Sequence, residues 1–227
     1  DEITVYFFVS EQSGIDNLNA EGKRDEQIYF VGNTMIDTLV AFDEAIAQSP
    51  IMEELSLPKG EPFVLVTMHR PANVDTVESL EKMIQLLAFT AERYRIILPL
   101  HPRTKNRLEQ FGLWEEFSTL DRLTLTGPMD YLAFQKLISQ STFVLTDSGG
   151  IQEETTFRQV ACITLRPNTE RPSTIDLGTN ELASFDLAEL TQKIDRIAKG
   201  TYKQGQVPPL WDGKSTERIV AHLKNLL

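Results

Sequence analysis

The chain of 227 residues carries 33 acidic and 22 basic side chains, a formal net charge of −11 at pH 7. Because binding to nucleic acid or to an anionic membrane needs clustered Lys and Arg, this charge argues against both kinds of partner, while a small anionic ligand stays compatible with it. With 41% hydrophobic residues the chain can bury a substantial core, and no run approaches the roughly 20 apolar residues that span a bilayer.

Short β-branched or aromatic runs alternate with longer amphipathic stretches along the whole chain. In chain order the predicted elements are strand 3–9, helix 11–20, strand 27–31, helix 33–48, strand 62–68, helix 76–93, strand 94–99, helix 103–110, strand 122–126, helix 130–139, strand 142–146, helix 150–157, strand 160–165, strand 181–184, helix 187–199 and helix 215–226. The stretches 49–60 and 200–213 contain Pro, Gly and Lys and are predicted to be exposed loops. The alternation indicates an α/β fold, a Rossmann-like doubly wound parallel sheet with helices on both faces.

The single cysteine, Cys162, lies in an apolar run and is predicted to be a buried structural thiol, since one cysteine cannot build a disulfide framework or a zinc site. This cysteine usage fits a reducing, cytoplasmic setting. The chain has no initiator Met and no basic-then-apolar signal pattern, and it starts inside a strand-like run. We therefore expect it to be a fragment of a longer protein.

Polar and basic residues gather at the carboxyl ends of five predicted strands. They are His69 and Arg70, His101, Gly127, the run from Asp147 to Gly150, and Arg166. In doubly wound sheets ligands bind in the crevice beyond the carboxyl ends of the strands. The sequence therefore predicts one ligand-binding rim built from these residues.

The segment 146–155, TDSGGIQEET, follows a predicted strand and opens a predicted helix. Ser148, Gly149 and Gly150 would let backbone N–H groups approach an anion closely at a helix N-terminus, where the helix dipole adds a partial positive charge. A phosphate is one predicted occupant. The alternative is a tight strand-to-helix turn in which Asp147 or Ser148 is only an N-cap and the glycines serve turn geometry.

Two consecutive glutamates, Glu153 and Glu154, are expected in the first turn of this helix, where acidic side chains complement the helix dipole. The dipole accounts for one of them and not for both. A glutamate one turn inside a phosphate-binding helix can accept hydrogen bonds from ribose hydroxyls. Glu154 is therefore a candidate ribose ligand.

Two His-Arg pairs end neighbouring predicted strands, His69 with Arg70 and His101 with Arg103. A lone histidine at such a position is more often a hydrogen-bonded structural residue than a catalyst. The repetition favours an anionic ligand that faces both pairs.

Residues around these pairs have simpler expected roles. Pro71 blocks extension of the preceding strand, and Asp75 or Thr76 is available to cap the next helix. Lys105 and Arg107 are expected on a solvated helix face.

The loop after the strand 160–165 holds Arg166, Glu170 and Arg171 between two prolines. Such a loop can position charge for recognition, or it can be a salt-bridged surface loop. Further upstream, Tyr131 and Phe134 could stack on a base, although their spacing on a predicted helix also suits a core position.

Seven segments stand in a characteristic order. They are GN at 32–33, MHRPANVD at 68–75, HPR at 101–103, YLAF at 131–134, TDSGGIQEE at 146–154, LRPNTERP at 165–172 and DGKSTERI at 212–219. Together they resemble the C-terminal half of the UDP-N-acetylglucosamine 2-epimerases. The resemblance covers nearly the whole chain, and TDSGGIQEE followed by a TERP loop at this separation is a highly specific pair.

The resemblance implies two Rossmann-like domains that face one cleft, as in the GT-B glycosyltransferases. The segment 1–31 would be the end of a truncated N-terminal domain, and 32–227 the C-terminal, UDP-sugar-binding domain. Non-hydrolysing members interconvert UDP-GlcNAc and UDP-ManNAc by eliminating UDP to give 2-acetamidoglucal and adding it back. The carboxylates that move protons in the family lie in the N-terminal domain, so this chain is expected to bind better than it catalyses.

The resemblance also implies a role for each matching residue. His69 would lie at the reacting end of the substrate. The diphosphate would be held by Ser148, Gly149 and Gly150, with Arg171 facing it. The ribose would be held by Glu154, and the uracil by Phe134 with the backbone near Met129. No cofactor, metal, nucleic acid or membrane partner is implied. The full-length protein is expected to be a cytoplasmic homodimer that acts in polysaccharide and cell-envelope biosynthesis.

Two departures from the family pattern affect these expectations. Ala72 stands where the family's His-Arg-x-Glu-Asn has glutamate, and Ser173 stands where an acidic residue usually follows TERP. Some non-hydrolysing members bind a second, activating UDP-GlcNAc through positions like Arg70 and His101, and the sequence leaves that site open. It also leaves open a hydrolysing epimerase and a nucleotide-sugar-binding module, whereas the TERP loop with MHR argues against a GT-B glycosyltransferase donor domain.

Overall fold

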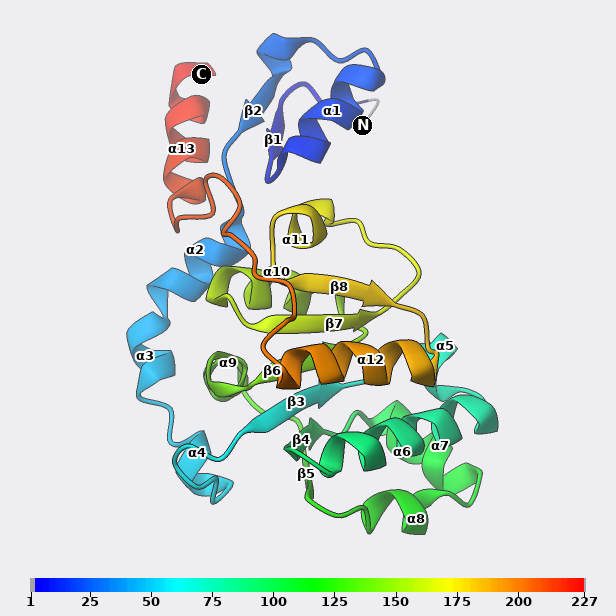
Figure 1. Cartoon of the computed structure of the whole chain (residues 1–227). Helices are drawn as coiled ribbons and strands as arrows, with labels where there is room; N and C mark the ends of the chain where they lie inside the picture. The colour runs from blue at the N-terminus through cyan, green and yellow to red at the C-terminus, as the bar shows by residue number, and fades with distance from the viewer. Residues whose placement is uncertain (1–2, 227) are drawn as a thin grey trace.

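The computed structural model describes residues 3–226, and its centre is a six-stranded sheet in which all neighbouring strands are parallel (Figure 1). The strands are β3 (Phe63–Thr67), β4 (Arg95–Pro99), β5 (Leu123–Thr126), β6 (Phe143–Thr146), β7 (Ala161–Leu165) and β8 (Asn180–Ala183). Their order across the sheet is β5-β4-β3-β6-β7-β8. The chain thus runs from the central strand β3 to the edge strand β5, returns to the centre at β6, and continues to the other edge at β8. This confirms the predicted doubly wound α/β sheet, and its topological switch point lies between β3 and β6.

Helices connect the strands, and several begin where the sequence supplies a capping residue. They are α1 (Gln12–Ala20), α2 (Thr34–Ala41), α3 (Asp43–Ala47), α4 (Ile51–Glu54), α5 (Pro71–Val74), α6 (Val77–Ala91), α7 (Pro102–Gln110), α8 (Trp114–Ser118), α9 (Tyr131–Gln140), α10 (Gly149–Arg158), α11 (Pro172–Asp176), α12 (Leu187–Ala198) and α13 (Ser215–Leu226). The side chains of Thr76, Asp130 and Asp186 accept backbone hydrogen bonds at the starts of α6, α9 and α12. Within residues 3–226, no helix combines the length and the apolar character that a membrane crossing needs.

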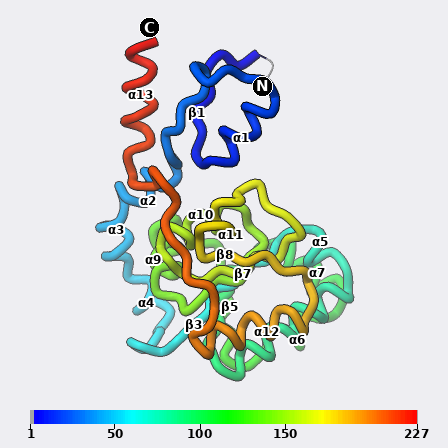
Figure 2. Tube along the Cα trace, turned by 45° about the horizontal axis from the view of Figure 1, so that its top comes forward, coloured from blue at the N-terminus to red at the C-terminus, as the bar shows by residue number. Residues whose placement is uncertain are grey.

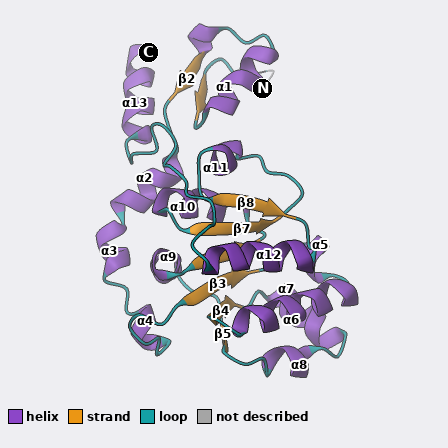
Figure 3. Ribbon diagram, viewed as in Figure 1, coloured by secondary structure: helices purple, strands orange, loops and turns teal. Residues whose placement is uncertain are grey.

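Both faces of the sheet are buried, so its central strands are apolar at consecutive positions. Val64 and Val66 of β3 face a core that α6 and α12 share. Phe63 and Leu65 face the opposite core, which α9 and α10 share, and Figure 3 shows these helices in place beside the strands. Cys162 lies in the second core and is fully buried, as predicted, and burial raises the pKa of its thiol to about 11.

The sequence-based prediction missed four short helices and merged two others. The predicted helix 33–48 is divided at Phe42 into α2 and α3, and the predicted loop 49–60 contains α4. The helices α5, α8 and α11 have four or five residues each and were not predicted. Segments this short show too few periodic positions for an apolar face to be recognised.

A smaller unit stands apart from the six-stranded sheet. Strands β1 (Phe7–Val9) and β2 (Ile28–Phe30) pair in parallel and are joined by α1. Helix α13 lies beside this unit at the same end of the molecule (Figure 2), with the rings of Tyr29 and His222 4.4 Å apart. The chain thus returns to the small unit at its C-terminal end, and the domain boundary between residues 31 and 32 stays a prediction.

The connection between the two units passes through Gly32, which has a φ of +89°. A Cβ at this position would lie 2.1 Å from the backbone oxygen of Leu210, so only glycine fits. Nearby, the carboxylate of Asp37 accepts hydrogen bonds from the backbone N–H groups of Ser215, at 2.9 Å, and Thr216, at 2.6 Å. These bonds satisfy the free amides at the start of α13 and fix this helix to α2.

Candidate ligand-binding site

A pocket of about 250 Å³ opens at the carboxyl ends of the central strands. It is lined by Thr67, Met68, His69, Pro99, Leu100, His101, Pro102, Pro128, Ser148 and Ile151. These residues follow or end β3, β4, β5 and β6, so the pocket lies at the rim that the strand ends predicted and at the topological switch point.

Asp147 joins the two strand ends on either side of the switch point. Its side chain is fully buried. Oδ2 accepts hydrogen bonds from the backbone N–H groups of His69 and Arg70, at 2.9 and 2.7 Å, and from Nδ2 of Asn73 at 3.1 Å. Oδ1 lies 2.9 Å from Nδ1 of His69. The interpretation of Asp147 as an N-cap is wrong, because its carboxylate binds the turn after β3 and not the start of α10.

The N-terminus of α10 is open to an anion. Ser148 occupies the N-cap position, yet its side chain makes no capping hydrogen bond, so the alternative of a simple side-chain cap also fails. A Cβ at Gly149 would lie 3.1 Å from Nη1 of Arg171 and 3.5 Å from Nη1 of Arg166. Two guanidinium groups thus lie against the first residue of the helix, where the free amides and the dipole already favour negative charge.

The loop that carries these arginines is internally paired. The carboxylate of Glu170 lies 3.1 Å from Nη2 of Arg166 and 3.2 Å from Nη1 of Arg171, and its hydrogen bonds to Arg166 lower the pKa of Glu170. The side chain of Glu170 is 68% exposed, whereas that of Arg166 is 7% exposed. The loop therefore has the salt bridges of one predicted alternative and presents charge at the predicted anion site as well.

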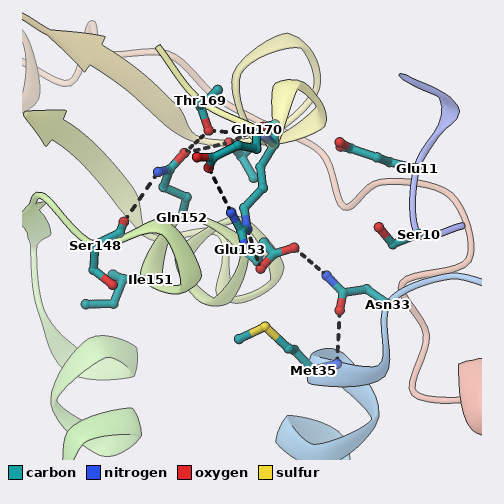
Figure 4. Close-up of polar contacts among 12 residues, drawn as sticks. Ser10, Glu11, Asn33, Met35, Ser148, Ile151, Gln152, Glu153, Thr169 and Glu170 are labelled. Carbon is teal, nitrogen blue, oxygen red and sulfur yellow. Dashed lines mark hydrogen bonds and ion pairs between the residues drawn. The ribbon is translucent and has the colours of Figure 1, made fainter. Parts of the chain in front are cut away.

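Glu153 forms an ion pair with Arg171. The expectation that Glu153 complements the helix dipole is wrong. Helix α10 begins at Gly149, so its first turn holds no acidic residue. One oxygen of Glu153 accepts a hydrogen bond from Nδ2 of Asn33 at 2.8 Å, and the other lies 2.8 Å from Nε of Arg171. Figure 4 shows Glu153 between the segment that precedes α2 and the arginine loop. Glu153 is thus a buried counter-ion that orients Arg171.

Glu154 occupies a different environment one residue further on. Burial raises the pKa of Glu154 to about 7, and the neighbouring charge of Glu153 acts in the same direction, while the nearby side-chain amide of Gln135 and the charge of Arg158 oppose it. The side chain is buried, and its neighbours Gln135 of α9 and Arg158 differ from Asn33 and Arg171, the partners of Glu153. The structure therefore separates the two glutamates, as two different functions would require.

The two predicted aromatic and apolar uracil contacts lie between core and surface. Phe134 and Met129 are half-buried and pack against the core beneath α9, whereas Tyr131 is exposed. The predicted alternative of a core position thus holds for the buried part of Phe134. Its role at a base stays a prediction.

The histidines and the arginines of the two His-Arg pairs have different surroundings in the structure. The rings of His69 and His101 lie 5.3 Å apart in the pocket. Arg103, however, binds Asp75 through Nε at 2.9 Å, and Arg107 binds the same carboxylate at 3.2 Å. Arg103 thus does not line the pocket, and its contact with a ligand stays a prediction, whereas the expectation that Arg107 is only solvated is wrong. Because the carboxylate of Asp75 binds these two arginines, Thr76 and not Asp75 caps α6.

Three residues of this region were not singled out from the sequence. Gln152 is fully buried, and its Oε1 accepts hydrogen bonds from Thr169 at 2.7 Å and from Asn180 at 3.1 Å. Asn33 holds Glu153, and Glu11 of the small unit accepts a hydrogen bond from the backbone N–H of Ser173 at 3.1 Å. Asn33 and Gln152 stand in two of the characteristic segments, GN and TDSGGIQEE, whereas Glu11 has no sequence signal. Among residues 3–226 no group of three or more His, Cys, Asp and Glu side chains could hold a metal ion.

Comparisons with known proteins identify the family that this chain is similar to. The family model described as UDP-N-acetylglucosamine 2-epimerase matches residues 1–224. The UDP-N-acetylglucosamine 2-epimerase of Methanococcus maripaludis is 34% identical over 224 residues, which are 97% of this chain and 61% of that protein. The UDP-2,3-diacetamido-2,3-dideoxy-D-glucuronate 2-epimerase of Pseudomonas aeruginosa is 31% identical over 229 residues, 100% of this chain and 61% of that protein.

Among solved structures, the crystal structure of Methanocaldococcus jannaschii UDP-GlcNAc 2-epimerase in complex with UDP-GlcNAc and UDP matches with a TM-score of 0.86 and 33% identity. The match covers 99% of this chain and 62% of that chain. The chain thus spans about 61% of the length of the curated relatives it matches.

Proposed function

The chain belongs to the UDP-N-acetylglucosamine 2-epimerase family, and we propose that it is the nucleotide-binding part of a non-hydrolysing UDP-GlcNAc 2-epimerase. The whole enzyme would interconvert UDP-GlcNAc and UDP-ManNAc by eliminating UDP and adding it back with the opposite configuration at C2. Residues 32–227 would form the UDP-sugar-binding domain, and 1–31 the end of an N-terminal domain.

One observation carries the proposal. The N-terminus of α10 has two glycines, an unused capping hydroxyl, and the guanidinium groups of Arg166 and Arg171 against Gly149. Backbone amides and arginines together bind diphosphates well, because they supply charge and several donors in fixed positions. When the bond between C1 and the diphosphate breaks, negative charge grows on UDP, and these groups would stabilise it.

The other proposed contacts extend from this point in two directions. Glu154 would accept hydrogen bonds from the ribose, with Phe134 and the backbone near Met129 at the uracil. His69 would face the leaving diphosphate at the sugar end, with Arg70 and His101 at the same rim. The proton transfer at C2 is assigned to carboxylates of the remainder of the full-length protein, and we propose a cytoplasmic homodimer acting in polysaccharide and cell-envelope biosynthesis.

The direct test is calorimetric titration of this chain with UDP in the presence of EDTA. Because the proposed partners of the diphosphate are amides and arginines, UDP should bind under these conditions. Arg171→Leu should weaken UDP and free pyrophosphate to the same degree, whereas Arg196→Leu, a control at the distant Glu181 on β8, should change neither. Failure of wild-type UDP binding, or its loss on adding EDTA, would contradict the proposal.

A second substrate is favoured by one specific relative. The Pseudomonas aeruginosa protein, 31% identical to this chain, acts on UDP-2,3-diacetamido-2,3-dideoxy-D-glucuronate. It would use the same UDP site with a different sugar. Turnover of the two UDP-sugars by the full-length protein, compared side by side, distinguishes these substrates, and release of free ManNAc would instead indicate a hydrolysing enzyme.

A further inference from the structure

The pocket holds two imidazole rings whose Nδ1 atoms have opposite kinds of partner. Nδ1 of His69 lies 2.9 Å from Oδ1 of Asp147, a carboxylate with no exposed surface. Nδ1 of His101, by contrast, accepts a hydrogen bond from the backbone N–H of Arg103 at 3.1 Å. The two rings lie 5.3 Å apart. Each ring is therefore fixed at one nitrogen by a group of known hydrogen-bonding character.

These partners determine where each neutral ring carries its proton, since a neutral imidazole has one N–H donor and one acceptor nitrogen. An ionised carboxylate only accepts, and among residues 3–226 no hydrogen bond reaches Oδ1 of Asp147, so that Nδ1 of His69, 2.9 Å away, is the group that can supply one. The proton of His69 therefore belongs on Nδ1. A backbone N–H only donates, so Nδ1 of His101 must be bare and its proton must be on Nε2.

We propose that Asp147 is a positioning residue that holds His69 in the Nδ1–H tautomer, while the turn at Arg103 holds His101 in the Nε2–H tautomer. At the pocket, neutral His69 then offers Nε2 as an acceptor, and neutral His101 offers Nε2–H as a donor. The pair is complementary to a ligand that both donates and accepts hydrogen bonds, such as the hydroxyl groups of a sugar.

The consequence for turnover rests on the proposed function, whereas the two tautomers do not. To donate a hydrogen bond to the departing diphosphate, His69 must take up a proton at Nε2, and the charge of Asp147 then faces the imidazolium that results. His101 can donate from Nε2 without becoming charged. Asp147 thus determines which nitrogen of His69 is available to the ligand, and it does not contact the ligand itself.

Asp147→Asn is a sharp test because the surrounding donors fix the orientation of the new amide. Oδ2 of Asp147 receives three N–H groups, from the backbone of His69 and Arg70 and from Asn73, so the oxygen of the asparagine must take that place. The NH₂ group then faces Nδ1 of His69 and donates to it. The proton of His69 should move to Nε2.

The measurement is ¹⁵N NMR of the ring nitrogens in this chain, without substrate. The chain has three histidines, so spectra of His69→Gln and His101→Gln assign the two rings of interest. We expect wild-type His69 as Nδ1–H and His101 as Nε2–H, and in Asp147→Asn we expect only His69 to change tautomer. Asp75→Asn, a neighbouring carboxylate that binds Arg103 and Arg107 and not an imidazole, is the control and should leave His69 unchanged.

Two results would overturn the proposal. One is a wild-type His69 that carries its proton on Nε2 or exchanges between both nitrogens, and this measurement does not depend on the folding of any Asp147 variant. The other is a folded Asp147→Asn chain with an unchanged His69. In the full-length protein, Asp147→Asn should lower kcat at least about a hundredfold with little change in the Kd for UDP, as a misplaced tautomer does in serine proteases. Normal tautomers with no epimerase activity would refute the proposed function and leave the positioning role intact.

Discussion

Replacement of Glu154 by Gln should have opposite effects on folding and on binding. Burial raises the pKa of Glu154 from 4.5 to about 7, so ionisation of this side chain disfavours the folded state at neutral and alkaline pH. A pKa difference of this size corresponds to about 3 kcal/mol of folding free energy. Glutamine keeps the shape and cannot ionise. Glu154→Gln should therefore stabilise the unliganded chain by up to about 3 kcal/mol at pH 8, roughly 6 to 12 °C in Tm.

The sign of the pH dependence follows from the direction of the shift. Because the folded state binds this proton more tightly than the unfolded state, the wild-type stability from Glu154 is complete below pH 4.5 and is lost as the pH rises through about 7. The difference between Glu154→Gln and wild type should therefore be near zero at pH 4.5 and reach its full value above pH 7. Urea unfolding at several pH values measures it, with Glu116→Gln at an exposed carboxylate on α8 as the control.

UDP binding should change in the other direction. A carboxylate that accepts hydrogen bonds from ribose hydroxyls contributes about 1.5 to 3 kcal/mol, and the amide replaces it poorly. Calorimetry should show weaker UDP binding and unchanged binding of free pyrophosphate. A variant that is less stable at pH 8, or one that loses UDP and pyrophosphate equally, would refute the assignment of Glu154 as a buried carboxylate reserved for the ribose.

Three further variants test neighbouring groups. His69→Asn should lower kcat of the full-length enzyme about a hundredfold with a nearly unchanged Tm, and a loss of activity that merely follows the folded fraction would make His69 structural. Gly149→Ala should keep or raise Tm, since alanine favours helix, yet weaken UDP about tenfold because its Cβ would meet Arg171 at 3.1 Å; equal UDP affinity would remove Arg171 from the site. Glu170→Gln should strengthen UDP binding up to about fivefold at low salt, because an exposed carboxylate no longer competes for Arg166 and Arg171, and weaker binding would instead make Glu170 an orienting residue.

Much of this site could be predicted because its local signals are strong. The strand before Asp147, the glycines and the helix after them are adjacent in sequence, and the elements found there are β6 and α10. The position of Glu153 could not be predicted, because its partner Asn33 lies 120 residues away and α10 begins one residue before the predicted helix 150–157. Because the helix begins one residue earlier, Glu153 lies beyond its first turn, where it pairs with Arg171 and does not complement the helix dipole.

The partnership of Asp147 with His69 shows which information the sequence lacks. Each residue follows a predicted strand, but nothing local says which strands are neighbours. In the folded sheet Thr67 of β3 pairs with Thr146 of β6, and their hydroxyl oxygens lie 2.7 Å apart. Once that register is fixed, the residues that follow each threonine must meet, because parallel strands end at the same edge. The contact between carboxylate and imidazole is therefore a consequence of strand order, and strand order is set by packing on both faces of the sheet.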